Sequence, residues 1–204
     1  MRIFAVGRNY AEHIAELNNE KPDEPIIFTK PDTALLRNNA PFYYPGFSQD
    51  IHHEVELVLR ISKEGKNIDE KFAYKYYDSI GIGIDFTARD LQQKLKTKGL
   101  PWDIAKGFNG SAPISEKFIP ASEFKDLKNI NFKLEIDGQL KQSGNTSLMI
   151  FGFEYVISYL SRFFTLKTGD LIFTGTPAGV SAVHIGNKLV AYIEDEKLLE
   201  FEVK

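Results

Sequence analysis

The chain has 204 residues, of which 43% are hydrophobic and 26% charged, and its 25 Lys and Arg residues nearly balance 28 Asp and Glu residues. This composition is typical of a soluble globular protein, and we expect a single domain, 1–204. The absence of cysteine excludes disulfides, thiolate metal sites and cysteine nucleophiles. The sequence has no long basic run and no apolar stretch of about 20 residues. We therefore expect no nucleic-acid partner, no membrane partner and a cytoplasmic location.

Short strands and short helices alternate in the first half of the sequence. Apolar patterns between turn-forming residues predict strands at 3–6, 26–29, 41–44, 53–61 and 80–84. Helical spacing and capping residues predict helices at 9–17, 67–77 and 87–98. The first of these helices leads into the polar stretch 18–25, and the other two are expected to be capped by Asn67 with Glu70 and by Thr87 with Asp90.

Strands dominate the second half. Asp137-Gly138 is a strong hairpin signal and joins the predicted strands 131–136 and 139–142. A helix is predicted from the spacing of Phe153, Val156, Ile157 and Leu160. Further strands are expected at 171–174, 189–194 and 198–203. This order is too irregular for a doubly wound sheet, so the predicted fold class is α+β with mixed strands.

Three carboxylates form the first candidate site. Alternation along a strand puts Glu54 and Glu56 on the same face, with their Cα atoms roughly 6.6 Å apart. For this pair alone, a solvated strand face is a simpler explanation than a metal site. Asp85 follows the next clear strand, where functional side chains are common, and three carboxylates suit a hard cation such as Mg²⁺ or Mn²⁺ better than Zn²⁺. We expect His52 and His53 to support the structure or the ligands rather than to bind the ion.

A histidine and a lysine could supply acid–base chemistry. His13 and Glu16 lie three residues apart on the first predicted helix, where a carboxylate can orient an imidazole base. Taken alone, the pair is explained more simply by a solvated helix face that carries Glu12, His13 and Glu16. Lys106 has apolar and glycine neighbours and could either snorkel to the surface or neutralise an anionic substrate. The loop 175–179 follows a strand, and its N–H groups and the Thr176 hydroxyl could bind a carboxylate, or it could be a plain turn.

A series of motifs resembles the fumarylacetoacetate hydrolase family, from about residue 4 to residue 180. Each motif is weak singly, but their common order makes the resemblance specific. It is closest to the short, single-domain members with acylpyruvase and oxaloacetate decarboxylase activity. The motifs are Gly7-Arg8-Asn9-Tyr10, His13-Ile14-Ala15-Glu16, His53-Glu54-Val55-Glu56-Leu57, Asp85-Phe86-Thr87-Ala88-Arg89-Asp90-Leu91-Gln92, Ala105-Lys106-Gly107-Phe108, Thr146-Ser147-Leu148-Met149-Ile150-Phe151 and Gly175-Thr176-Pro177.

The resemblance implies a fold, a cofactor and roles for nine residues. The expected fold is a mixed β-sheet roll with short flanking helices and an N-terminal lid helix, usually in a homodimer with one Mg²⁺ or Mn²⁺ per subunit. The implied metal ligands are Glu54, Glu56 and Asp85. The implied catalytic residues are His13 and Glu16 on the lid, together with Lys106. The residues implied to bind substrate are Arg89, Gln92 and Thr176.

The resemblance also implies a reaction. We expect a Mg²⁺-dependent hydrolase that cleaves C–C bonds in small 2,4-dioxo acids (acylpyruvates) through a metal-bound enolate, with His13 and Glu16 activating water. An oxaloacetate decarboxylase or tautomerase and a 2-hydroxyhepta-2,4-diene-1,7-dioate isomerase are alternatives on the same site. In each case the partner is a small 2-oxo acid. A metal-dependent oxo-acid-binding protein without activity is the alternative from another class.

Overall fold

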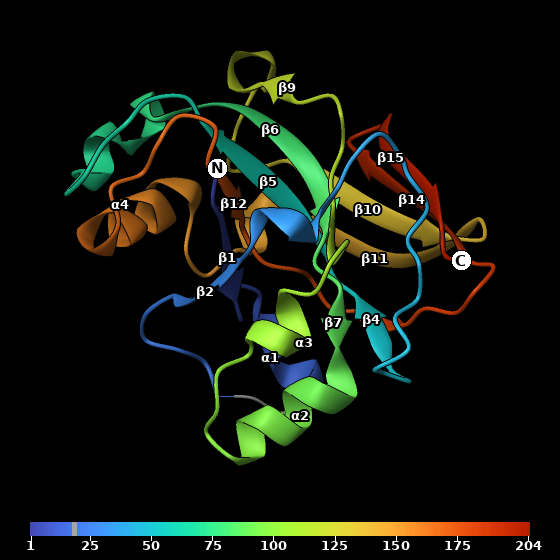
Figure 1. Cartoon of the computed structure of the whole chain (residues 1–204). Helices are drawn as coiled ribbons and strands as arrows, with labels where there is room; N and C mark the ends of the chain where they lie inside the picture. The colour runs from blue at the N-terminus through green and yellow to red at the C-terminus, as the bar shows by residue number, and fades with distance from the viewer. Residues whose placement is uncertain (18–19) are drawn as a thin grey trace.

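The largest sheet of the protein has six strands in the computed structural model, which describes residues 1–17 and 20–204 (Figure 1). Its order is β2-β1-β12-β5-β6-β9; β1 and β12 run parallel, and the other neighbours are antiparallel. The first two residues of the predicted polar stretch 18–25 lie outside the described residues. The strands are β1 (Ile3–Gly7), β2 (Ile26–Lys30), β5 (Val55–Ile61), β6 (Tyr77–Ile84), β9 (Ile119–Pro120) and β12 (Leu171–Phe173).

A second sheet of four antiparallel strands, in the order β11-β10-β14-β15, packs against the same apolar core (Figure 1). Buried and exposed residues alternate along β10 and β14, as expected when one face of a sheet is covered. The predicted hairpin is confirmed: Asp137 and Gly138 both have positive φ, 52° and 75°, which suits a tight two-residue turn. The strands are β10 (Asn131–Ile136), β11 (Gln139–Asn145), β14 (Lys188–Ile193) and β15 (Glu196–Glu202).

The helices are short and flank the sheets. The helix predicted from apolar spacing is α4, and its four predicted apolar positions are all buried. The fold class is α+β with mixed sheets, as predicted. Within the described part of the chain, no helix has the length and apolar character needed to cross a membrane. The α-helices are α1 (Ala11–Glu16), α2 (Arg89–Thr97), α3 (Asp103–Lys106) and α4 (Phe153–Phe163).

The strand predicted at 53–61 is divided, and the break matters for the site. Its first part belongs to a three-stranded sheet, β13-β4-β7, whereas β5 begins at Val55 in the large sheet. Glu54 therefore lies where two sheets meet. The additional strands are β3 (Leu35–Leu36), β4 (Ile51–His53), β7 (Thr87–Ala88), β8 (Ala112–Pro113) and β13 (Ser181–Ala182).

The helix predicted at 67–77 is wrong. The segment forms a short 3₁₀ helix, Glu70–Lys75, and Tyr77 already begins β6. Asp69, not Asn67, caps this helix, because its carboxylate accepts the N–H of Lys71 at 3.2 Å. Three further 3₁₀ helices lie at Asp32–Ala34, Ala121–Glu123 and Thr146–Leu148.

Two other predicted boundaries are also wrong. Thr87 pairs with His52 as part of β7 instead of capping a helix, so α2 begins at Arg89. The residues 41–44 form only an isolated bridge, between Phe42 and Val203, rather than a strand. For Thr87, pairing with a distant part of the chain replaced the local pattern.

Candidate active site

Glu54, Glu56 and Asp85 come together where the large sheet meets the small sheet. The backbone N–H of Asp85 donates to the carbonyl oxygen of Glu54 at 2.8 Å, which continues the pairing of β5 with β6. Ligand atoms of the three carboxylates lie within 4.8 Å of one another. Their exposed fractions are 5%, 2% and 1%, so the alternative of a solvated strand face is wrong. We refer to these three residues as the carboxylate cluster.

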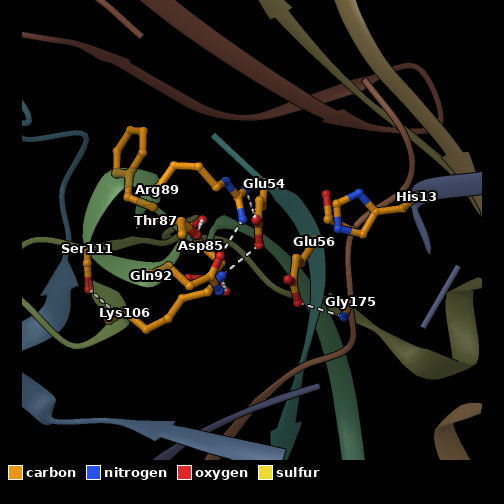
Figure 2. A network of polar contacts seen from close by, with 12 residues as sticks. His13, Glu54, Glu56, Asp85, Thr87, Arg89, Gln92, Lys106, Ser111 and Gly175 are labelled. Atoms are coloured by element: carbon orange, nitrogen blue, oxygen red, sulfur yellow. Dashed lines mark hydrogen bonds and ion pairs between the residues drawn. The ribbon is translucent and has the colours of Figure 1, made fainter. Parts of the chain in front are cut away.

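Three cationic side chains bind the carboxylate cluster, and Figure 2 shows two of them, Lys106 and Arg89. Lys106, at the end of α3, donates from Nζ to Glu54 Oε2 and Asp85 Oδ2, both at 2.7 Å. Arg89 Nη2 lies 2.5 Å from Glu54 Oε1. The buried Lys106 ammonium thus neutralises carboxylates of the protein, and it does not snorkel to the surface.

Lys30 is the cation that the sequence analysis missed. It ends β2 with a fully buried side chain, and its Nζ lies 2.7 Å from Asp85 Oδ1. The same Nζ donates to the Ser111 hydroxyl at 3.0 Å and to the Lys106 carbonyl. Burial lowers the pKa of Lys30, partly offset by the charge of Asp85. A lysine at the end of an apolar strand was the available signal.

Glu54 and Glu56 have opposite electrostatic environments. Burial alone would raise the pKa of Glu54, but the charges of Lys106 and Arg89 outweigh it and hold that pKa well below its usual range. Burial and the charges of Asp85 and Glu54 raise the pKa of Glu56 well above its usual range. Glu56 accepts one backbone N–H, from Gly175 at 2.6 Å, and forms no ion pair with a described residue.

The carboxylate cluster fits a divalent cation. It offers only oxygen donors, which Mg²⁺ and Mn²⁺ prefer, and it is closed to bulk solvent. A positive ion beside Glu56 would supply the counter-charge that this carboxylate lacks among the described side chains. Glu54, Glu56 and Asp85 are thus the residues that could hold such an ion.

His13 and Glu16 form the predicted pair beside the carboxylate cluster. His13 on α1 is buried, and its ring points toward the side of Glu54 and Glu56 (Figure 2). Its Nδ1 lies 3.2 Å from Glu16 Oε2, while Glu16 Oε1 accepts the N–H of Gly179 at 3.0 Å. This carboxylate fixes the ring and leaves Nε2 for a substrate. A solvated helix face is therefore wrong for His13, although Glu12 on the same helix is exposed.

The predicted substrate-binding residues also border the carboxylate cluster. Gln92 accepts a hydrogen bond from Arg89 at 2.6 Å. Thr176 accepts one from Gln142 Nε2 at 2.8 Å, and Gln142 Oε1 lies 2.9 Å from Nδ1 of His53. Gln142, which the sequence analysis did not identify, thus ties the 175–179 loop to β4.

His52 and His53 have structural roles. His53 is buried between Gln142 and Ser181, and burial lowers its pKa to about 4. His52 binds Asp50 at 2.9 Å, and burial and the charge of Arg89 lower its pKa. These contacts agree with the expectation that neither binds the ion.

A cavity of about 40 Å³ joins eight of the nine predicted site residues, all but Glu16. This space is small for a 2-oxo acid, and His13 on α1 forms part of its wall. A lid that moves with α1 stays a prediction. The residues that line the cavity are Val6, Gly7, Arg8, His13, Leu17, Phe28, Glu54, Glu56, Asp85, Arg89, Gln92, Lys96, Trp102, Lys106 and Thr176.

The mixed α+β fold buries three carboxylates beside a histidine–glutamate pair and two lysines, an arrangement that could hold a divalent cation. Residues 2–204 match the family model described as fumarylacetoacetate (FAA) hydrolase C-terminal. The chain belongs to the fumarylacetoacetate hydrolase family.

Relatives in this family have several activities. The chain is 48% identical to the mitochondrial oxaloacetate decarboxylase of Dictyostelium discoideum, over 91% of this chain and 85% of that protein. It is 39% identical to the mitochondrial oxaloacetate tautomerase of Homo sapiens, over 99% and 91%. A structure of fumarylpyruvate hydrolase from Pseudomonas aeruginosa in complex with Mn²⁺ and pyruvate matches with a TM-score of 0.93 at 37% identity, over 100% and 89%. These relatives support an enzyme.

Proposed function

We propose that the protein is a divalent-cation-dependent enzyme of small 2-oxo acids, and that its main reaction is the tautomerisation and decarboxylation of oxaloacetate. The observation that carries the first part is the buried carboxylate cluster next to His13 and Lys106. The similarity to oxaloacetate decarboxylase and tautomerase supports the choice of substrate. This reaction is one of the alternatives that the sequence analysis kept open.

A divalent cation on Glu54, Glu56 and Asp85 would polarise the 2-oxo group and favour negative charge on its oxygen. His13, held by Glu16, is placed to move a proton between C3 of the substrate and solvent through Nε2. In tautomerisation C3 loses a proton and the C2 oxygen gains one. In decarboxylation the C3–C4 bond breaks, CO₂ leaves, and C3 gains a proton. Lys106, already between two carboxylates, adds positive charge where the oxygen becomes negative.

Hydrolysis of 2,4-dioxo acids is the second candidate. Two observations support it. The first is the His13–Glu16 pair, because a fixed imidazole can deprotonate a water molecule that attacks the distal carbonyl. The second is the similarity to fumarylpyruvate hydrolase. The Mg²⁺ preference, the homodimer and the cytoplasmic location stay predictions.

Parallel assays with Mg²⁺ and Mn²⁺ test both candidates. Purified protein should accelerate the keto–enol exchange of oxaloacetate and the release of pyruvate from oxaloacetate. Hydrolysis of acetylpyruvate is measured in parallel. EDTA should abolish the activity. If neither substrate is turned over with either metal, the proposed function is wrong; faster turnover of acetylpyruvate would make hydrolysis the main reaction.

A further inference from the structure

Two cationic side chains line the cavity beyond the carboxylate cluster and have no place in the proposed chemistry. They are Arg8, between β1 and α1, and Lys96, near the end of α2, and both are half-buried. Arg89, Gln92 and Lys96 follow the spacing i, i+3, i+7, so they share one face of α2. Cationic and polar groups therefore continue along α2 away from Glu54, which Arg89 binds.

The backbone holds Arg8 in an unusual conformation. Its φ is 58°, in the left-handed region that L residues adopt only where the surroundings impose it, often at ligand-binding positions. The next residue, Asn9, fixes this turn by donating to the carbonyls of Phe151 and Thr174 at 3.0 and 2.8 Å. Arg8 forms no ion pair with any residue that the structure describes, although it borders a cavity lined by acidic groups.

The charge of the cavity favours a ligand with more than one negative charge. Arg8, Arg89, Lys96 and Lys106 line it against only three carboxylates, and a bound divalent cation would add two positive charges. Burial and the charges of Arg8 and Arg89, which line the same cavity, lower the pKa of Lys96. A dianion would offset this excess better than a monoanion.

We propose that Arg8 and Lys96 bind the far carboxylate of a dicarboxylic 2-oxo acid and thereby select dicarboxylic over monocarboxylic substrates. This inference rests on the proposed function, because it places the near 2-oxo end of the ligand at the carboxylate cluster. Arg89 and Gln92 lie between the two ends along α2. The preference would apply to tautomerisation, decarboxylation and hydrolysis alike.

Two unreactive probes of equal length test this selection. 2-Oxoglutarate and 2-oxopentanoate each have five carbons, and only the first carries a second carboxylate. Calorimetric titration of the Mn²⁺-loaded protein should show tighter binding of 2-oxoglutarate. Arg8→Asn and Lys96→Gln should each reduce this preference by about tenfold or more, the size of a lost charge-assisted hydrogen bond, and leave the affinity for 2-oxopentanoate within about threefold.

The choice of variants separates binding from folding. Asn tolerates the left-handed conformation, so Arg8→Asn removes the guanidinium without added backbone strain. Arg8→Lys should recover part of the preference, and Lys94→Gln, at an exposed position of α2, should not change it. Thermal unfolding of each variant checks the fold.

The outcomes also separate this inference from the proposed function. Two outcomes would contradict this inference while 2-oxopentanoate and oxalate still bind. In the first, neither variant changes the affinity ratio of 2-oxoglutarate to 2-oxopentanoate. In the second, each variant binds both oxo acids more weakly by the same factor, so that Arg8 and Lys96 do not select the second carboxylate. If neither oxo acid nor oxalate binds the Mn²⁺-loaded protein, the proposed function fails, and this inference fails with it.

Discussion

Glu54 and Glu56 lie two residues apart at one cavity, yet only Glu54 has cationic partners. Lys106 and Arg89 both bind Glu54, whereas Glu56 accepts a single backbone N–H from Gly175. The carboxylate cluster therefore lacks a counter-charge at Glu56 among the described side chains. This difference makes opposite predictions for the two carboxylates.

Replacing Glu56 should stabilise the metal-free protein. Its pKa is raised in the fold, so its contribution to stability is present below the unfolded pKa and is lost as pH rises through the folded pKa. In EDTA at pH 8, Glu56→Gln should unfold at a higher temperature than the native chain, by about 2–4 °C for each kcal/mol gained in the free energy of unfolding. The gain should shrink as pH falls toward 5. Added Mn²⁺ should raise the melting temperature of the native chain and not that of the variant.

Glu54→Gln is the matched control and should have the opposite effect. It removes the ion-pair partner of Arg89 and one of the two carboxylates that bind Lys106, and breaking a buried ion pair costs about 3–5 kcal/mol. A lower melting temperature is expected in EDTA at pH 8. If both variants changed stability in the same direction, the assigned difference between the two carboxylates would be wrong.

Lys106→Met should impair both stability and activity. It removes the ammonium shared by Glu54 and Asp85 and should cost about 3–5 kcal/mol without metal. The loss of positive charge beside the reacting oxygen should lower kcat by about 10²–10³-fold. Urea unfolding and steady-state kinetics measure these two effects. Lys98→Met, at an exposed position, should change neither; unchanged kcat in the Lys106 variant would contradict the role given to this residue.

His13→Ala should separate the reactions that share the site. Hydrolysis of acetylpyruvate and tautomerisation of oxaloacetate need a proton-transfer group, and each should fall by about 10²–10⁴-fold. Decarboxylation needs no activated water and no proton removed from C3, and its enolate product can take up a proton from solvent, so this activity should largely survive. Glu12→Gln, on the exposed side of α1, is the control. Equal loss of all three activities would show that His13 is required for something common to them, such as substrate binding.

The residues of the candidate site were predictable because each lies in a short motif of fixed order. Glu54, Glu56 and Asp85 come from adjacent strands, so sequence pattern and strand pairing indicate the same cluster. Lys30 lies in no such motif. The apolar strand that it ends is a local signal, but nothing local marks its contact with Asp85, which is far along the chain. The same reason explains β7, where Thr87 pairs with His52 instead of capping α2. Long-range pairing decides such positions, and local pattern does not contain it.

Gly175 should tolerate no side chain, because it joins the carboxylate cluster to the β1–α1 junction. Its φ is 102°, and a Cβ there would lie 2.6 Å from Cβ of Asn9. Gly175→Ala should therefore both strain the turn and displace the N–H that Glu56 accepts, with a loss of about 1–3 kcal/mol in the free energy of unfolding. Gly46→Ala, which meets nothing within 4 Å, should be nearly neutral. Chemical unfolding compares the two variants, and Mn²⁺ titration should show weaker binding only in Gly175→Ala. A native-like Mn²⁺ affinity in that variant would mean that the Gly175 N–H does not position Glu56 for the ion.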